Sequence, residues 1–343
     1  MSSPLPQVTA PAPAASPPRR PRRGQARHQP QPLSPDQIDA RLRRLELTIS
    51  RRLEGLLHGD HLGLLPGPGS ERAESREYRL GDDVRRMDWA VTARTLVPHV
   101  NDLIADRELT TYAVVDLTAS MDFGTHTWEK RDLALSATTA FGVLTTRLGS
   151  RFGLTTLLGA GAAHEIVELP ARSGRDALRR SLRTLLTAPR ALPSGARAGT
   201  DSGTRPLTQA LENLGRRPLH RGLVVVVSDL LGPPDSWSKP LRALTGRHQV
   251  LMVEIRDPRE LTLPSVGVLN LTDPETGAQL EVDTRSPQLR ARYAAAAAAQ
   301  RAEVAATIRR ARAGHLVLST DADWLLSIAR FVAAARRTRG VAR

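Results

Sequence analysis

The stretch VVDLTASMD at residues 114–122 decides how this sequence folds. Its valines continue a strand-like stretch that begins at Thr110, and such a stretch is typical of a buried strand. The run then leads directly into an acid, Asp116, and two hydroxyls, Thr118 and Ser120. A strand that ends in this way places several oxygen-bearing side chains at one end of a sheet.

A second apolar run ends in the same manner. The letters VVVVSD close at Asp229, after four consecutive valines. In an open parallel sheet, ligands bind beyond the carboxyl ends of the strands, where the strand order reverses. Magnesium prefers oxygen ligands and retains several waters, and manganese accepts the same ligand set. The residues therefore predict one Mg²⁺ or Mn²⁺ site at Asp116, Thr118, Ser120 and Asp229. The competing interpretation is that these side chains only cap loops.

Outward from these runs, strand patterns alternate with helical patterns. Strands are expected at 110–117, 151–158, 164–169, 222–228, 249–255, 266–271, 280–283 and 315–319. Helices are expected at 128–148, 173–186, 206–214, 237–246, 287–313 and 321–336. Alternation of this kind predicts an α/β fold, with a mostly parallel sheet and helices on both faces. We place this domain at 109–336.

The region before this domain divides into two parts. Residues 1–33 are rich in proline and arginine and are expected to be disordered. Residues 34–108 begin with a capping box, Ser34 and Gln37, which predicts the start of a helix. Apolar residues then recur at helical spacing and predict an amphipathic helix: Ile38, Leu42, Leu45, Ile49, Leu53 and Leu56. The charged segment 70–108 has no clean period, and we expect it to pack on the domain with Trp89 as a buried anchor.

The acids and hydroxyls resemble a known metal site. The pattern of Asp116, Thr118 and Ser120, with Asp229 after a valine-rich strand, is similar to the metal-ion-dependent adhesion site of von Willebrand factor type A domains. That resemblance implies a further threonine ligand, for which Thr204 has nearly the expected spacing and Thr200 is the alternative. It also implies that a partner protein supplies an Asp or Glu to the metal.

Longer segments resemble a narrower family. The letters REYRLGDDVRRMDWAVTAR at 76–94, and two later segments at 256–284 and 315–331, are similar to the domain of unknown function 58 family. The resemblance covers roughly residues 35–335 and implies a von Willebrand A-like domain. Members of this family are associated with MoxR-type AAA+ ATPases, so such an ATPase is the partner that the resemblance implies. Some members carry membrane helices, whereas this chain resembles the soluble branch.

Composition narrows the functional classes. The chain of 343 residues has no cysteine, which excludes disulfides and thiolate chemistry. No apolar run is long enough to span a bilayer, so we expect no membrane span and a cytoplasmic location. The formal net charge is +14. Much of it lies in the arginines of the first 33 residues and of a basic tail that we place at 337–343. Such tails are more often solvated than bound to nucleic acid, so a nucleic-acid partner is not expected.

These observations favour a non-catalytic function. We expect a metal-dependent, protein-binding adaptor or chaperone-like factor that helps to assemble or remodel a complex, with no small-molecule substrate. The alternatives are a metal-independent scaffold with a degenerate site, a metal-dependent hydrolase, and nucleic-acid binding through the tails. No phosphate-binding GxxxxGK[ST] loop is present. We therefore do not expect the chain itself to bind ATP through such a loop.

Overall fold

The structure is a computed structural model that describes residues 34–56, 75–79, 84, 87–101, 110–146, 150–160, 163–190, 206–275 and 277–340. The expected tail at 1–33 lies outside these ranges. The last helix continues to Gly340, so the first part of the segment expected as a second tail, 337–343, is helical. Most other elements lie within a few residues of the predicted positions.

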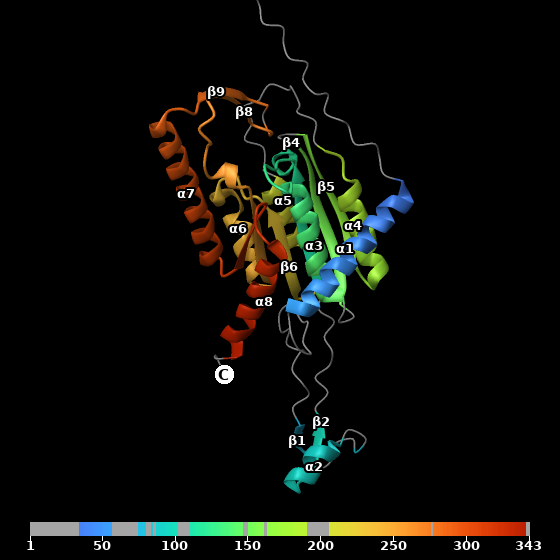
Figure 1. Ribbon diagram of the computed structural model, residues 1–343. Helices are drawn as coiled ribbons and strands as arrows, with labels where there is room; N and C mark the ends of the chain where they lie inside the picture. Colours follow the sequence, from blue (N-terminus) through green and yellow to red (C-terminus); the bar gives the residue numbers. More distant parts are fainter. Residues whose placement is uncertain are drawn as a thin grey trace, which may run out of the picture.

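A six-stranded sheet forms the centre of the fold (Figure 1). Its spatial order is β10-β7-β6-β3-β4-β5, and all neighbours run parallel except β4 and β5. In chain order this is 3-2-1-4-5-6, so the order reverses between β3 and β6. The strands are β3 (Thr110–Thr118), β4 (Arg151–Ala160), β5 (Ala163–Ser173), β6 (Gly222–Ser228), β7 (Gln249–Arg256) and β10 (Gly314–Ser319).

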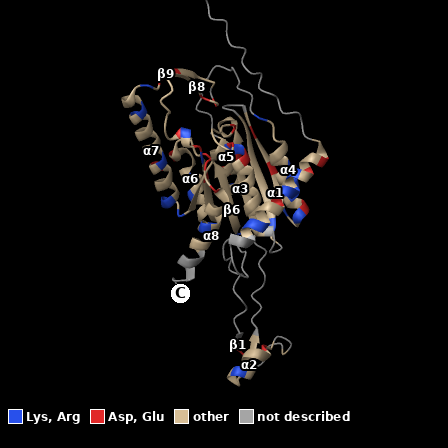
Figure 2. Cartoon of the chain, in the orientation of Figure 1, with Lys and Arg blue, Asp and Glu red and all other residues tan. Residues whose placement is uncertain are grey.

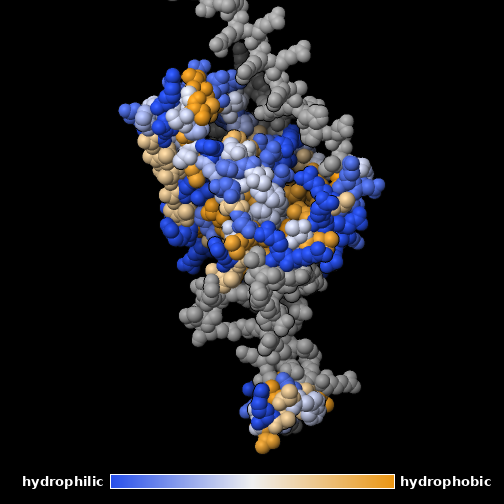
Figure 3. Space-filling view, viewed as in Figure 1, coloured by the Kyte–Doolittle hydropathy of each residue, from blue (hydrophilic) through white to orange (hydrophobic). Residues whose placement is uncertain are grey.

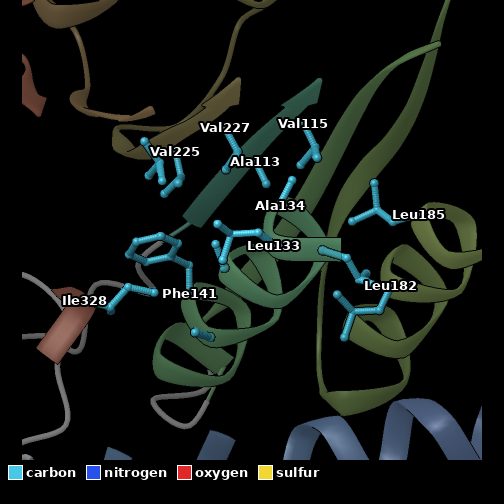
Figure 4. Close-up of a cluster of buried hydrophobic side chains, with 14 of the residues drawn as sticks. Ala113, Val115, Leu133, Ala134, Phe141, Leu182, Leu185, Val225, Val227 and Ile328 are labelled. Carbon is cyan, nitrogen blue, oxygen red and sulfur yellow. The ribbon is translucent and has the colours of Figure 1, made fainter. Parts of the chain in front are cut away.

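Helices cover both faces of this sheet, as predicted. Alternate residues of each strand face opposite sides, so the central strands contribute to two apolar clusters. Figure 4 shows the first cluster, to which Val115, Val227 and Phe141 belong. Helices α3 (Lys130–Thr146), α4 (Arg175–Thr187) and α8 (Trp324–Gly340) pack on this face. Helices α5 (Pro206–Arg216), α6 (Pro234–Thr245) and α7 (Pro287–Arg310) pack on the other.

Helix α1 (Pro35–Leu56) adds an outer layer on α3, α4 and α8. The predicted capping box is confirmed: the Gln37 N–H donates to Ser34 Oγ over 3.3 Å, and the Ser34 N–H donates to Gln37 Oε1 over 2.9 Å. Most of the predicted apolar face is buried, and the side chain of Leu56 lies outside the described residues. Figure 2 marks charged residues on α1 and α4, and Glu46 of α1 pairs with Arg179 of α4 at 3.4 Å.

The described residues of the charged segment 70–108 form a small two-stranded sheet with one short helix, separate from the central sheet. The segment contains β1 (Ser75–Glu77), α2 (Trp89–Thr95) and β2 (His99–Asn101), and β1 pairs with β2. The prediction that Trp89 is a buried anchor is wrong, because 71% of its surface is exposed. The Asp88 side chain caps α2 and thereby places Trp89 in the first turn. This seven-residue helix buries none of its side chains, so it provides no core for the indole.

A two-stranded hairpin lies beyond the carboxyl ends of the central strands (Figure 1). It consists of β8 (Val268–Thr272) and β9 (Gln279–Asp283), which were predicted as a hairpin. The side chain of Val282 is buried, whereas Val268 and Leu280 are exposed. Figure 3 shows apolar residues at this end of the molecule.

Candidate functional site

The strand β3 ends in a set of mutually bonded oxygen groups. Oδ1 of Asp116 accepts hydrogen bonds from Oγ1 of Thr118 at 2.7 Å and from the Thr118 N–H at 3.0 Å. Oγ1 of Thr118 lies 3.4 Å from Oγ of Ser120. Ser120 belongs to a short 3₁₀ turn, η2 (Ala119–Met121), that follows the strand. The predicted trio is therefore gathered at one point, and all three side chains are buried.

The neighbouring strand β6 supplies the second acid. Its last residue, Ser228, donates from Oγ to Oδ2 of Asp116 over 2.7 Å, which ties the two strand ends together. Asp229 follows immediately and is also buried. The next residue, Leu230, is buried with a φ of 52°, a left-handed conformation that costs a branched residue about 1 kcal/mol. Such strain persists where surrounding structure enforces it, and it clusters at functional sites.

The two acids lie close enough to influence each other's ionisation. Burial raises the pKa of Asp116, and the neighbouring carboxylate of Asp229 raises it further, to about 6. Hydrogen bonds from Ser228 and Thr118 act in the opposite direction. Two buried carboxylates at one sheet edge therefore favour the presence of a cation.

A cation of the chain itself already lies at Asp229. Lys130, the first residue of α3, has no exposed side-chain surface. Its Nζ lies 2.8 Å from Oδ2 of Asp229 and also bonds Glu260. Burial opposes the charge, but Asp229 and Glu260 together raise the pKa of Lys130, so it remains an ammonium ion. Neither Lys130 nor Glu260 was predicted as a residue of the site.

The rarity of lysine in this sequence singles out Lys130. The chain has 49 lysines and arginines together, and only two of them are lysines, Lys130 and Lys239. A compact ammonium fits a closed pocket that a planar guanidinium does not fill in the same way. Nearly all basic residues of this chain are arginines, so a lysine indicates a position with a particular steric requirement.

Behind Lys130, the ionic contacts continue through the domain. Arg301 of α7 donates to the backbone oxygen of Asp229 over 2.7 Å and to Oε1 of Glu254 over 2.9 Å. Glu254 of β7 also bonds Arg256 at 2.7 Å and His315 of β10 at 2.8 Å. The loop that carries Asp229 is thus attached to α7 and, through Arg301, to β7.

The remaining predicted ligands can be placed only in part. Thr204 and its alternative Thr200 both lie outside the described residues. Within the described part of the chain, no group of three or more His, Cys, Asp or Glu side chains gathers as a metal cluster. Of the five predicted ligands, the described residues contain two carboxylates, Asp116 and Asp229, and two hydroxyls, Thr118 and Ser120.

Comparison with known proteins identifies the family. The family model described as "Protein of unknown function DUF58" matches residues 74–303. The chain belongs to the DUF58 family. An uncharacterized protein of Mycobacterium tuberculosis is 52% identical to this DUF58 protein over 300 residues, which cover 88% of this chain and 90% of the relative.

Two solved structures show weaker likeness to this DUF58 protein. A von Willebrand factor type A protein from Catenulispora acidiphila has a TM-score of 0.34 and 12% identity, covering 71% of this chain and 44% of that one. An aerotolerance-related membrane protein from Bacteroides fragilis has a TM-score of 0.39 and 12% identity, covering 67% and 99%. The strand order of the central sheet assigns the fold. No helix in the described part of the DUF58 chain combines the length and apolar character needed to cross a bilayer.

The residues of the DUF58 site fit a small divalent cation. All of the donors are oxygens, which suits Mg²⁺ or Mn²⁺. Asp116 and Asp229 would balance the charge of the ion, and Thr118 and Ser120 would offer neutral hydroxyl ligands. Lys130 neutralises part of the acid charge, so an ion here would be weakly held and would have a strong preference for a further anionic ligand.

Proposed function

We propose that this DUF58 protein is a non-catalytic, protein-binding adaptor or chaperone-like factor. Its binding site is the carboxyl edge of the sheet, where Mg²⁺ or Mn²⁺ is held by Asp116, Thr118, Ser120 and Asp229, with Thr204 assisting. A partner protein completes the site with an Asp or Glu. The fit of the oxygen set supports the metal, and the raised pKa of Asp116 supports the need for positive charge.

Exposed apolar side chains near the site and on the hairpin support a protein partner. Phe123 comes just after the η2 turn that carries Ser120 and is 39% exposed. Leu231 lies two residues after Asp229 and is 38% exposed. On the hairpin, Val268 is 55% exposed and Leu280 is 64% exposed. Exposed apolar residues around a polar centre are characteristic of protein interfaces. A small-molecule substrate would not require this surface outside the site.

We also propose where this adaptor acts and with which partner. By the family resemblance, the adaptor works in the cytoplasm beside a MoxR-type AAA+ ATPase and assists the assembly or remodelling of a protein complex. The ATPase would supply the energy, and this chain would hold the target. Pulldown of such an ATPase by the wild-type chain in Mg²⁺ buffer, with loss on metal removal, is the expected result.

Calorimetric titration with Mg²⁺ and Mn²⁺ tests the metal. We expect saturable binding by the wild-type chain, weakened about tenfold or more in Asp116→Asn, because the variant loses one of the two carboxylate charges. Circular dichroism would first show that the variant is folded. Asp235→Asn, an exposed acid on α6, is the matched control and should bind as the wild type does. Equal affinities in all three proteins would contradict the proposed ligands.

Lys130 favours a second candidate function, a metal-independent form of the same adaptor. Its ammonium already pairs with Asp229 and Glu260, so positive charge is present without an ion. In this form, a partner binds the same edge equally well with Mg²⁺ or with a chelator. Absence of Mg²⁺ and Mn²⁺ binding by the wild-type chain would favour this candidate over the first.

A further inference from the structure

The turn of the β8–β9 hairpin contacts the proposed binding site directly. The backbone N–H of Ser120 donates to Oε1 of Glu275 over 3.0 Å, although the two residues are 155 positions apart in the chain. Ser120 lies in the η2 turn after β3, and Glu275 lies in the turn between β8 and β9. A carboxylate from outside the sheet therefore reaches the loop that carries the predicted ligands.

The local structure of the turn presents this carboxylate. The Glu275 N–H donates to Oδ1 of Asp273 over 2.9 Å, and the Gly277 N–H donates to the Asp273 carbonyl over 2.8 Å. Gly277 has a φ of 70°, which a glycine adopts without steric cost. The acid is thus carried on a tight, hydrogen-bonded turn, which holds it against the loop of Ser120.

The hairpin is anchored at its base and exposes apolar surface nearer its turn. At the base, buried Thr284 donates from Oγ1 to the Gly267 carbonyl over 2.7 Å, and Val282 is buried. Nearer the turn, Leu280 is 64% exposed, and within the described residues the two strands pair only with each other. A two-stranded hairpin is marginally stable in water. Movement of the turn away from Ser120 therefore disrupts little of the core.

We propose that the β8–β9 hairpin is an internal ligand. Its Glu275 carboxylate occupies the place that a partner's carboxylate takes, and binding of the partner displaces the turn. This inference rests on the proposed function, since it concerns the regulation of the same site. The hairpin also indicates the chemistry of the partner: an acid on a tight turn flanked by apolar residues, as Leu271 and Leu280 flank this one.

Such an internal ligand lowers the apparent affinity for a partner. A partner binds only the fraction of molecules in which the turn is released, so the apparent dissociation constant rises as that fraction falls. Removal of the Glu275 carboxylate should therefore increase affinity for an external acidic turn. A purely structural hydrogen bond would not produce such a gain.

The test uses a cyclised, fluorescently labelled peptide of residues 270–281 as an external ligand, measured by anisotropy with the full chain. We expect weak binding to the wild type and binding about tenfold tighter to Glu275→Ala. Glu281→Ala removes an exposed acid from β9 of the same hairpin and should behave as the wild type does. A peptide with Gln in place of Glu275, which keeps Glu281, should lose the gain. Equal affinities of the three proteins, or no binding to Glu275→Ala, would overturn the proposal.

The same titrations in Mg²⁺ and in chelator separate this inference from the proposed metal. A gain for Glu275→Ala in both buffers supports the internal ligand and favours the metal-independent form of the adaptor. A gain only in Mg²⁺ supports the internal ligand and the metal together. Calorimetric binding of Mg²⁺ without any gain for Glu275→Ala would overturn the internal ligand and leave the metal site standing.

Discussion

At the scale of single residues, the ammonium of Lys130 determines the electrostatics of the site. It is enclosed completely and lies between Asp229 and Glu260, whose side chains are 4% and 14% exposed. Burial of an ion pair is costly, and its net contribution to stability is small. Removal of only one member has a larger effect, because it leaves the opposite charge buried without a counter-ion.

We therefore expect Lys130→Met to lower the free energy of unfolding by about 3–5 kcal/mol. Methionine is unbranched and only one atom shorter than lysine, but it leaves the carboxylates of Asp229 and Glu260 without their cation. Urea unfolding of both proteins measures the difference. The exposed Lys239 is the matched control, and Lys239→Met should change stability by less than about 0.5 kcal/mol. Similar small changes in both variants would contradict the assigned ion pairs.

At the scale of elements, helix α1 packs on its neighbours through one apolar face. Ile49 is 1% exposed against the α3, α4 and α8 layer, whereas Leu47, two positions earlier, is 57% exposed. The ion pairs of α1 with neighbouring helices are largely at the surface, where each contributes little. Attachment of α1 thus depends mainly on its apolar side chains.

Ile49→Ala should lower the free energy of unfolding by about 2–4 kcal/mol, because it leaves a cavity in the core. Leu47→Ala, in the same helix, should change it by less than about 0.5 kcal/mol. Denaturant titration followed by circular dichroism measures both values. If the two variants unfold together, the outer layer described for α1 is incorrect.

At the scale of the whole molecule, the strand order places the site and the ionic contacts support it. Asp116 and Asp229 follow neighbouring strands at the point where the order reverses. Arg301 then connects the Asp229 loop to Glu254, deep in the sheet. Burial alone would raise the pKa of Glu254, but hydrogen bonds from His315 and Arg256, with the charge of Arg301, lower it to about 2.

This lowered pKa predicts loss of stability in acid. The carboxyl of Glu254 ionises more readily in the folded chain than at its ordinary pKa of 4.5, so its contribution is present above that pH. It is lost as the pH falls from about 4.5 toward 2, by on the order of 3 kcal/mol. Urea unfolding across this range should show a steeper decline for the wild type than for Glu254→Gln. Parallel curves would contradict the assignment.

The order of elements and part of the site followed from the sequence. Strand β6 and the strand-end acids were predictable because an apolar run and the residue after it are adjacent in the chain. Parallel strands then bring their carboxyl ends to one edge whatever their separation in sequence. The capping box of α1 was predictable for the same reason, since Ser34 and Gln37 are only three residues apart.

The tertiary structure decided the remaining features. Lys130 meets Asp229 across 99 positions and Glu260 across 130, and Glu275 meets Ser120 across 155. Neither periodicity nor local spacing encodes such contacts, because they depend on where distant loops return to the sheet. Trp89 shows the converse. Its large aromatic side chain was predicted to be buried, but the short helix that carries it offers no core. The sequence alone thus determined the sheet and the strand-end acids, which depend on neighbours in the chain, whereas folding determined the counter-ion and the carboxylate that meet them.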